Sequence, residues 1–195
     1  MTSVSSLEAL LGNAETSEKR YEWVKAASDY QQAVKKATDS GDLFKAATLQ
    51  ERVGYCLYRG AFQSETRNEF VEGIRSAIEV YEQADRSYAR LEEGSPWAYR
   101  CSAAASFLRH WLAATASEKG ELMKDWFYKQ EKALEGFWRR GEKMEYGRTY
   151  VRPTQALFEF FFDWVDNEFR KTGLEKGVEW GEKAIAALSE LNTKD

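Results

Sequence analysis

Hydrophobic and small residues recur along the chain with the spacing of an amphipathic helix, and one such pattern occurs four times. The stretch EWGEKAIAAL near the end is centred on Ala184, and similar stretches are centred on Ala133, Ala84 and Ala33. Successive centres lie 51, 49 and 51 residues apart. A short break that is polar or contains glycine follows each copy. The pattern therefore predicts a structural repeat of about 50 residues, each opening with a long helix.

The first two copies share a finer register. They contain the motifs Ala26-x-x-x-Tyr30-x-x-Ala33 and Ala77-x-x-x-Tyr81-x-x-Ala84. Residues spaced by three, four and seven positions share one face of a helix, and small residues there let a neighbouring helix approach closely. The third copy departs from the register with Trp126 and Gln130, and the fourth has glycines at both positions. We expect the central alanines to be buried in close helix contacts.

A second helix follows the first in each full unit. Its small and apolar residues are Val53, Gly54 and Leu57, then Ala104, Ala105 and Leu108, then Pro153, Thr154 and Leu157. The chain has only 2 prolines, and no two alternating strand patterns are joined by a tight turn. We predict an all-α fold of antiparallel helix hairpins with about seven long helices. The predicted domain spans 18–195, with units 18–67, 68–118 and 119–171 and a half unit 172–195, after an N-terminal extension 1–17 that holds part of a helix.

These motifs resemble the tetratricopeptide repeat (TPR) superfamily, whose unit pairs two antiparallel helices. The family has Leu-Gly-x-x-Tyr in its first helix, which Val53-Gly54-x-x-Leu57 approximates, and Ala-x-x-x-Phe/Tyr-x-x-Ala in its second, which the two alanine motifs match. The repeat here is about 17 residues longer than the family's, so the helices look more like the SNAP-type branch (soluble NSF attachment protein). The resemblance covers about residues 18–192, and it implies a curved solenoid with a concave face.

Composition and charge argue against several classes of function. The chain is 43% hydrophobic and carries a net charge of −4, which provides a core but not the basic surface typical of nucleic-acid binding. The two cysteines are not spaced as a CxxC motif and fit a reducing compartment. The N-terminal residues lack the pattern of a signal peptide, and no apolar run is long enough to span a bilayer. We therefore expect a cytoplasmic protein without nucleic-acid binding or membrane insertion.

Motifs for catalysis, metals and cofactors are missing from the sequence. His110 is the single histidine and lies in an apolar helical pattern, so we interpret it as a core or helix-surface residue. Glu159, Asp163 and Asp166 share a helix face and could hold Mg²⁺ or Ca²⁺, but a solvated outer face is the simpler interpretation. Neither a GxSxG nucleophile motif nor a phosphate-binding glycine loop occurs. The prediction is a protein that is not an enzyme and has no catalytic residue, metal or cofactor.

The third unit contains the candidate binding residues. Segment 139–152 is locally basic with interleaved tyrosines, and residues 126–169 hold 13 of the 28 aromatics. The helix around Pro153 should begin or kink there. Apolar residues cover so much of the circumference of this helix that it either packs against neighbours on two sides or exposes a patch that binds a partner. The candidate partner-binding residues are Arg139, Arg140, Lys143, Tyr146, Arg148, Tyr150, Arg152, Phe160 and Trp164.

The expected function is a non-catalytic adaptor domain that binds a protein or peptide segment, with an acidic segment as one option for the basic residues. An alternative is a sensory domain that holds an apolar or aromatic small molecule between units three and four. Apolar residues remain on the last helix, at Ile185, Leu188 and Leu191. Three interpretations account for these residues: the helix is the terminal cap of the array, the chain is a module of a larger protein, or the chain forms a homodimer through this helix.

Overall fold

The computed structural model describes residues 6–160 and 167–192, and all its regular elements are α-helices. The helices are α1 (Leu7–Lys19), α2 (Trp23–Asp39), α3 (Leu43–Ala61), α4 (Arg67–Leu91), α5 (Pro96–Leu112), α6 (Ala116–Arg139), α7 (Lys143–Phe160) and α8 (Asn167–Asn192). No strand occurs in the described ranges, so the predicted all-α class is confirmed. In those same ranges no helix is both long and apolar enough to cross a membrane.

The predicted number of about seven helices is one too few. The N-terminal residues form a complete helix, α1, whose first turn is capped by the Ser6 hydroxyl accepting from the Ala9 amide at 3.2 Å. Leu10 and Ala14 of α1 are buried against α2. The sequence pattern predicted only part of this helix, because its few apolar residues match many patterns.

Local signals in the sequence set the ends of the helices. Asp42, Thr66 and Thr115 each accept a hydrogen bond from the backbone amide three residues on, as helix caps do. Gly41 and Gly141 adopt positive φ in the turns after α2 and α6, where a side chain would be strained. The turn after α1 has the same hydrogen-bond pattern but places Tyr21 in that conformation, at φ 61°.

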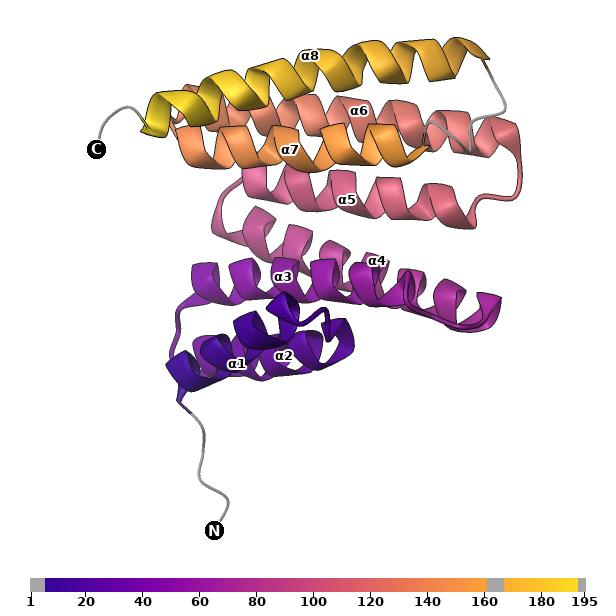
Figure 1. Ribbon diagram of the computed structural model, residues 1–195. Coiled ribbons are helices and arrows are strands. Elements are labelled where there is room, and N and C mark those ends of the chain that lie inside the picture. Colours follow the sequence, from indigo (N-terminus) through magenta and orange to yellow (C-terminus); the bar gives the residue numbers. More distant parts are fainter. Residues whose placement is uncertain (1–5, 161–166, 193–195) are drawn as a thin grey trace.

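Each helix packs mainly on its neighbours in the sequence, and the stack rises from α1 and α2 to α8 (Figure 1). The described linkers have three to five residues, so the helices that they join run in opposite directions. The central alanines of all four copies are buried, with Ala33, Ala84 and Ala133 fully so and Ala184 4% exposed. The contact between α6 and α7 is the weakest between consecutive helices.

The odd-numbered helices are also joined by partly buried ion pairs. Glu18 of α1 binds Arg52 of α3, whose Nε lies 2.5 Å from Glu18 Oε1. Arg100 of α5 lies between two carboxylates, at 2.7 Å from Glu51 of α3 and 2.5 Å from Glu145 of α7. Burial alone would lower the pKa of Arg100, but the two carboxylates raise it above its ordinary value. Arg100 therefore stays charged and ties three helices together.

Candidate functional site

The basic segment after α6 does not present free cations. Each of its described basic side chains faces a carboxylate, in the pairs Arg139–Glu135, Arg140–Glu92, Lys143–Glu190 and Arg148–Glu145. Arg140 also lies over the ring of Trp97, at 5.3 Å from its centroid. An acidic peptide would have to displace these partners. The side chains of Arg152 and Phe160, and the whole of Trp164, lie outside the described residues.

The two tyrosines of the segment lie on α7 and face α6 and α8. Their hydroxyl oxygens are 3.0 Å apart, and their rings meet edge to face at 4.9 Å. Tyr150 is only 4% exposed, whereas Tyr146 is half-buried. Burial, followed by the hydrogen bond with Tyr146, raises the pKa of Tyr150 well above its usual range. The Tyr150 hydroxyl therefore stays protonated at neutral pH, and one of the two hydroxyls donates to the other.

These tyrosines line a pocket of about 300 Å³ between α6, α7 and α8. Its walls are Glu131, Leu134, Glu135 and Trp138 of α6, Tyr146 and Tyr150 of α7, and Glu179, Trp180 and Lys183 of α8. The four residues of α6 are spaced at i, i+3, i+4 and i+7, so they share one face of that helix. This pocket lies at the junction of units three and four, where the alternative function placed a small molecule.

The floor of the pocket is aromatic and buried. Trp180 is 1% exposed, and its ring centroid lies 6.1 Å from that of Trp126, 5.6 Å from Phe127 and 6.3 Å from Tyr150. At the rim, Trp138 is 64% exposed and its ring lies 5.3 Å from that of Tyr146. The pocket thus combines one exposed aromatic side chain at its rim with a buried aromatic floor, and tryptophan is enriched at protein interfaces.

Two departures from the repeat accompany the weak contact between α6 and α7. Trp126 stands where the first two copies have Ala26 and Ala77, and its ring is buried between α5 and α8. Gln130 stands where those copies have tyrosine, and its Nε2 donates to the backbone carbonyl of Thr149 at 2.7 Å. A side chain as large as tryptophan cannot fit the close approach that alanine permits. Trp126 instead inserts between α5 and α8, and the Gln130 side chain spans from α6 to α7.

The hydrogen bond of Gln130 has a specific cause in α7. Pro153 has no N–H, so the carbonyl of Thr149, four residues earlier, lacks its usual partner in the helix. Gln130 supplies that partner from α6, in a buried position. The helix accordingly passes through Pro153 from its start at Lys143. Of the two expected outcomes, a helix start at Pro153 is wrong, and a kink there stays a prediction.

The charged residues of the pocket form a network at its rim. Lys176 lies 2.9 Å from Glu131 and 3.6 Å from Glu179, and Lys183 lies 2.5 Å from Glu179. The hydrogen bond from Lys183 lowers the pKa of Glu179 despite partial burial, and that to Glu131 raises the pKa of Lys176. Lys176 also lies over the Trp180 ring, with Nζ 5.9 Å from the ring centroid.

The nearest arrangement to a catalytic group lies elsewhere, between α5 and α6. Ser106 Oγ is 2.5 Å from Asp125 and accepts from Lys129 Nζ at 3.0 Å, and Lys129 also pairs with Asp125 at 2.6 Å. Ser106 is completely buried and Lys129 is held by a carboxylate. A nucleophile needs access and a base that can take its proton, so this cluster joins two helices rather than supporting chemistry.

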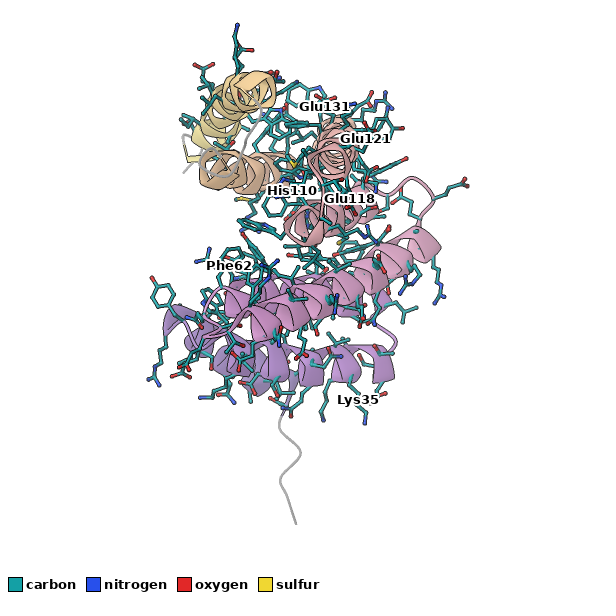
Figure 2. All side chains as sticks on the ribbon, turned by 90° about the vertical axis from the view of Figure 1, so that its right-hand side faces the viewer. Lys35, Phe62, His110, Glu118, Glu121 and Glu131 are labelled. Atoms are coloured by element: carbon teal, nitrogen blue, oxygen red, sulfur yellow. The ribbon has the colours of Figure 1, made fainter. Side chains whose placement is uncertain are left out.

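His110 is buried beside α6, as its place in the side-chain view shows (Figure 2). Glu118, Glu121 and Glu131, labelled in the same figure, follow one another along α6, and of these only Glu131 lines the pocket. Among the described residues no group of three or more His, Cys, Asp and Glu side chains is arranged to hold a metal ion. Asp163 and Asp166 lie outside the described residues, as does the side chain of Glu159.

On the outer face of α8, Val178 and Ile185 are 54% and 69% exposed. Leu188 instead turns inward and packs on Gly147, where an added Cβ would meet its Cδ2 at 2.6 Å. The side chain of Leu191 lies outside the described residues. The homodimer through this helix stays a prediction.

Sequence reasoning found Tyr146 and Tyr150 but missed most of the pocket. It did not select Glu131, Leu134, Glu135, Glu179, Trp180 or Lys183, and it counted Trp138 only among the aromatics. The available signal was the departure of the third copy from its register, together with Trp180 four residues before the central Ala184. A scan against protein-family models and a search of the curated proteins both found no match.

Proposed function

We propose that the chain is a non-catalytic helical repeat module that binds a protein or peptide segment, as an adaptor does. The pocket between α6, α7 and α8 carries the proposal, because it combines a buried aromatic floor with the exposed indole of Trp138. Tryptophan, tyrosine and arginine are the residues that most often anchor protein interfaces. The pocket is about the size of one or two side chains of a partner, so it would hold the anchor of a longer segment.

The proposal includes a TPR-like array, and the packing of the motif residues supports it. A Cβ added at Gly54 of α3 would lie 3.1 Å from the ring of Tyr81 in α4, so the first motif element approaches the second across this helix pair. The eight helices would then form four hairpins, α1–α2, α3–α4, α5–α6 and α7–α8. With the helices paired in this way, α8 is the second helix of a complete hairpin, and α1 is the first helix of another.

A random peptide library displayed on phage tests the proposal directly. We expect the wild-type chain to enrich a family of related peptides, and the Trp138→Ala variant to lose them. Tyr128→Ala is the matched control, because Tyr128 is also on α6 and 57% exposed but does not line the pocket. Equal enrichment by both variants would place the binding surface elsewhere, and no enrichment by the wild type would contradict the proposal.

The small-molecule alternative also has an observation in its favour. A volume of about 300 Å³ lies at the lower end of the range for ligand sites. Native mass spectrometry of the purified chain distinguishes the two. A bound compound that is lost in Trp138→Ala but kept in Tyr128→Ala would favour a sensory domain, and a chain at its own mass of 22.5 kDa would favour the adaptor.

A further inference from the structure

We propose that the outer face of α8, formed by Val178, Glu182 and Ile185, docks an amphipathic helix of a partner protein. The docking helix would carry a large apolar residue and, four residues earlier, a lysine or arginine. The outer face lies on the side of α8 opposite the buried Trp180, at one end of the stack (Figure 1). The inference therefore goes beyond the proposed function, because it concerns a surface that the pocket does not include.

The repeat register shows what this face corresponds to elsewhere in the chain. Its three residues lie six and two positions before, and one position after, the central Ala184. The same positions relative to Ala133 in α6 hold the same order of apolar, glutamate and apolar side chains, as Phe127, Glu131 and Leu134. The outer face of α8 therefore corresponds to a face of α6 that the chain itself covers.

Helix α8 covers that face of α6. The ring centroids of Phe127 and Trp180 are 5.6 Å apart, and Leu134 is buried in the wall of the pocket that Trp180 also lines. Lys176, four residues before Trp180, donates to Glu131 with a distance of 2.9 Å between Nζ and Oε1. A helix with a large ring and a lysine one turn earlier is thus the occupant that this pattern receives within the chain.

Two further pairs of even-numbered helices show the same matching of side chains. The position four residues before the central alanine holds Val80 in α4 and Lys129 in α6. Val80 packs against the apolar cluster that includes Val34 of α2, which occupies the register position of Ile185. In α4 that position holds Asp85: burial raises its pKa, and the positive charge of Lys129 opposes the rise. Apolar residues thus meet apolar residues and a carboxylate meets a cation, so Ile185 indicates an apolar partner.

The glutamate of the outer face differs from its counterparts in having no ion-pair partner among the described residues. Glu82 of α4 and Glu131 of α6, at the same register position, pair with Arg109 and Lys176. Glu182 is exposed, and its neighbour Lys183 pairs with Glu179 instead. A lysine or arginine of the docking helix would take this place, so the helix would match the outer face in charge as well as in apolar surface.

A second copy of the chain matches the outer face less well. Val178 and Ile185 flank Glu182 almost symmetrically, so two antiparallel copies of α8 would bring their Glu182 side chains together, and like charges repel. At the other end of the stack, α2 has Asp29 four residues before Ala33, where docking on the outer face requires an apolar residue. Both features favour the helix of a different protein.

A library of helical peptides tests this chemistry. Phage would display an alanine-based helix of about 18 residues with one face randomised, a length at which an isolated helix can form. We expect the wild-type chain to enrich helices with a large apolar residue and a lysine or arginine four residues earlier. No enriched helix, or enriched helices without the basic residue, would overturn the inference.

Variants of the outer face show where the enriched helices bind. We expect Val178→Ser/Ile185→Ser to bind them at least about tenfold more weakly than the wild type does. Val24→Ser/Leu43→Ser is the matched control, because these residues are also 70% and 50% exposed but lie on α2 and α3. Thermal unfolding shows whether each variant is folded. Equal binding by the two variants would overturn the assignment to α8.

A charge reversal tests the role of Glu182. In Glu182→Lys we expect the affinity for an enriched helix to fall about three- to tenfold, and the affinity for the same helix with glutamate at its basic position to rise. Glu72→Lys, at an exposed position of α4, should leave both affinities unchanged. A variant Glu182→Lys that still prefers the basic helix would overturn the pairing with Glu182.

Two further measurements separate this site from a homodimer and from the pocket. Sedimentation equilibrium should find the wild-type chain monomeric, and a dimer that Val178→Ser/Ile185→Ser abolishes would overturn the partner helix as the occupant. Trp138→Ala, at the rim of the pocket, should keep full affinity for the enriched helices. If it loses them, the helices bind at the pocket and the inference fails while the proposed function stands.

Discussion

The α2–α3 and α6–α7 interfaces begin in the same way and end differently. Both follow a three-residue turn with a glycine at positive φ, Gly41 or Gly141, and both have a buried central alanine, Ala33 or Ala133. The first pair stays in close contact, whereas the second meets weakly and borders a pocket. The same turn therefore does not determine how closely two helices pack further along their lengths. The side chains one and two turns before the central alanine determine this packing.

The difference shows how few residues specialise one unit of a repeat. In α2 the two positions are Ala26, fully buried, and Tyr30, whose hydroxyl lies beside Glu18 and Arg52. In α6 they are Trp126 and Gln130, and the amide of Gln130 satisfies a carbonyl that Pro153 leaves without a helical partner. A large ring and a polar bridge thus replace direct contact between the helices.

The largest effect should come from removing the charge that links α3, α5 and α7. Arg100→Met leaves the buried Glu51 without its cation and Glu145 with only the more exposed Arg148, and we expect a loss of about 3–5 kcal/mol in the free energy of unfolding. Urea denaturation measures the loss. Arg75→Met is the matched control on an exposed position, with an expected change within about 0.5 kcal/mol. Similar losses in the two variants would contradict a structural role for Arg100.

Gln130→Leu should break the bridge between α6 and α7. The buried carbonyl of Thr149 then has no donor, and we expect a loss of about 1–3 kcal/mol. Pro153→Ala restores an N–H in the helix, so the same Gln130→Leu change should cost much less in that background. A double-mutant cycle measures this coupling. Additive effects would show that Gln130 does not compensate for the proline.

The single histidine lies on α5, which packs against α6, and its response to pH can be compared with that of a variant. Burial, with a smaller contribution from Lys119, lowers the pKa of His110 from 6.5 to about 4. The unfolded chain therefore binds more protons than the folded chain between these values, and stability falls as the pH falls through this window. We expect a loss of about 2 kcal/mol between pH 7.5 and pH 5.

His110→Gln should remove most of this pH dependence, whatever its effect on stability at pH 7.5. Carboxylates titrate mainly below this window, so the comparison of the two slopes isolates the histidine. Parallel slopes in wild type and variant would show that His110 takes up no proton on unfolding.

The smallest effects are expected from two glycine-to-alanine substitutions. The sign of the change in stability should differ between a closely packed and a loosely packed position. An alanine Cβ at position 54 would lie 3.1 Å from the buried ring of Tyr81, whereas at position 181 it would lie 3.4 Å from Thr154 Cγ2. We expect Gly54→Ala to destabilise by about 1 kcal/mol through overpacking, and Gly181→Ala to stabilise by about 0.5 kcal/mol through helix propensity. Thermal melting of the two variants checks the signs. The same sign in both would contradict the contrast.

The fold followed from the sequence where the deciding signal was local. The spacing of Ala33, Ala84, Ala133 and Ala184 predicted helices with buried centres, and in the structure local caps such as Asp42 and Thr66 begin the helices. Helix α1 was missed as a complete element because its apolar residues form no distinctive pattern, and its stability comes from packing on α2.

The candidate site was predicted less well because long-range contacts determine it. Arg140 and Lys143 looked free in the sequence, but their carboxylates, Glu92 and Glu190, are 48 and 47 residues away. The pocket likewise needs three helices in place, and no spacing along the chain brings Tyr150 to Trp180. The departures at Trp126 and Gln130 were visible, but their meaning depended on which helix they faced.

The partly buried ion pairs of the odd-numbered helices have a consequence for how the chain folds during synthesis. A solenoid built only from contacts between neighbours could grow by one hairpin at a time. Here Glu51 emerges from the ribosome well before its partner Arg100, and Arg100 before Glu145. In each incomplete chain, one of these charged side chains therefore has no partner among the helices already synthesised. That side chain must stay hydrated until the later helix packs against it. The stack should thus close in larger cooperative steps, and shortening it from the C-terminal side by two helices would leave Arg100 with a single carboxylate.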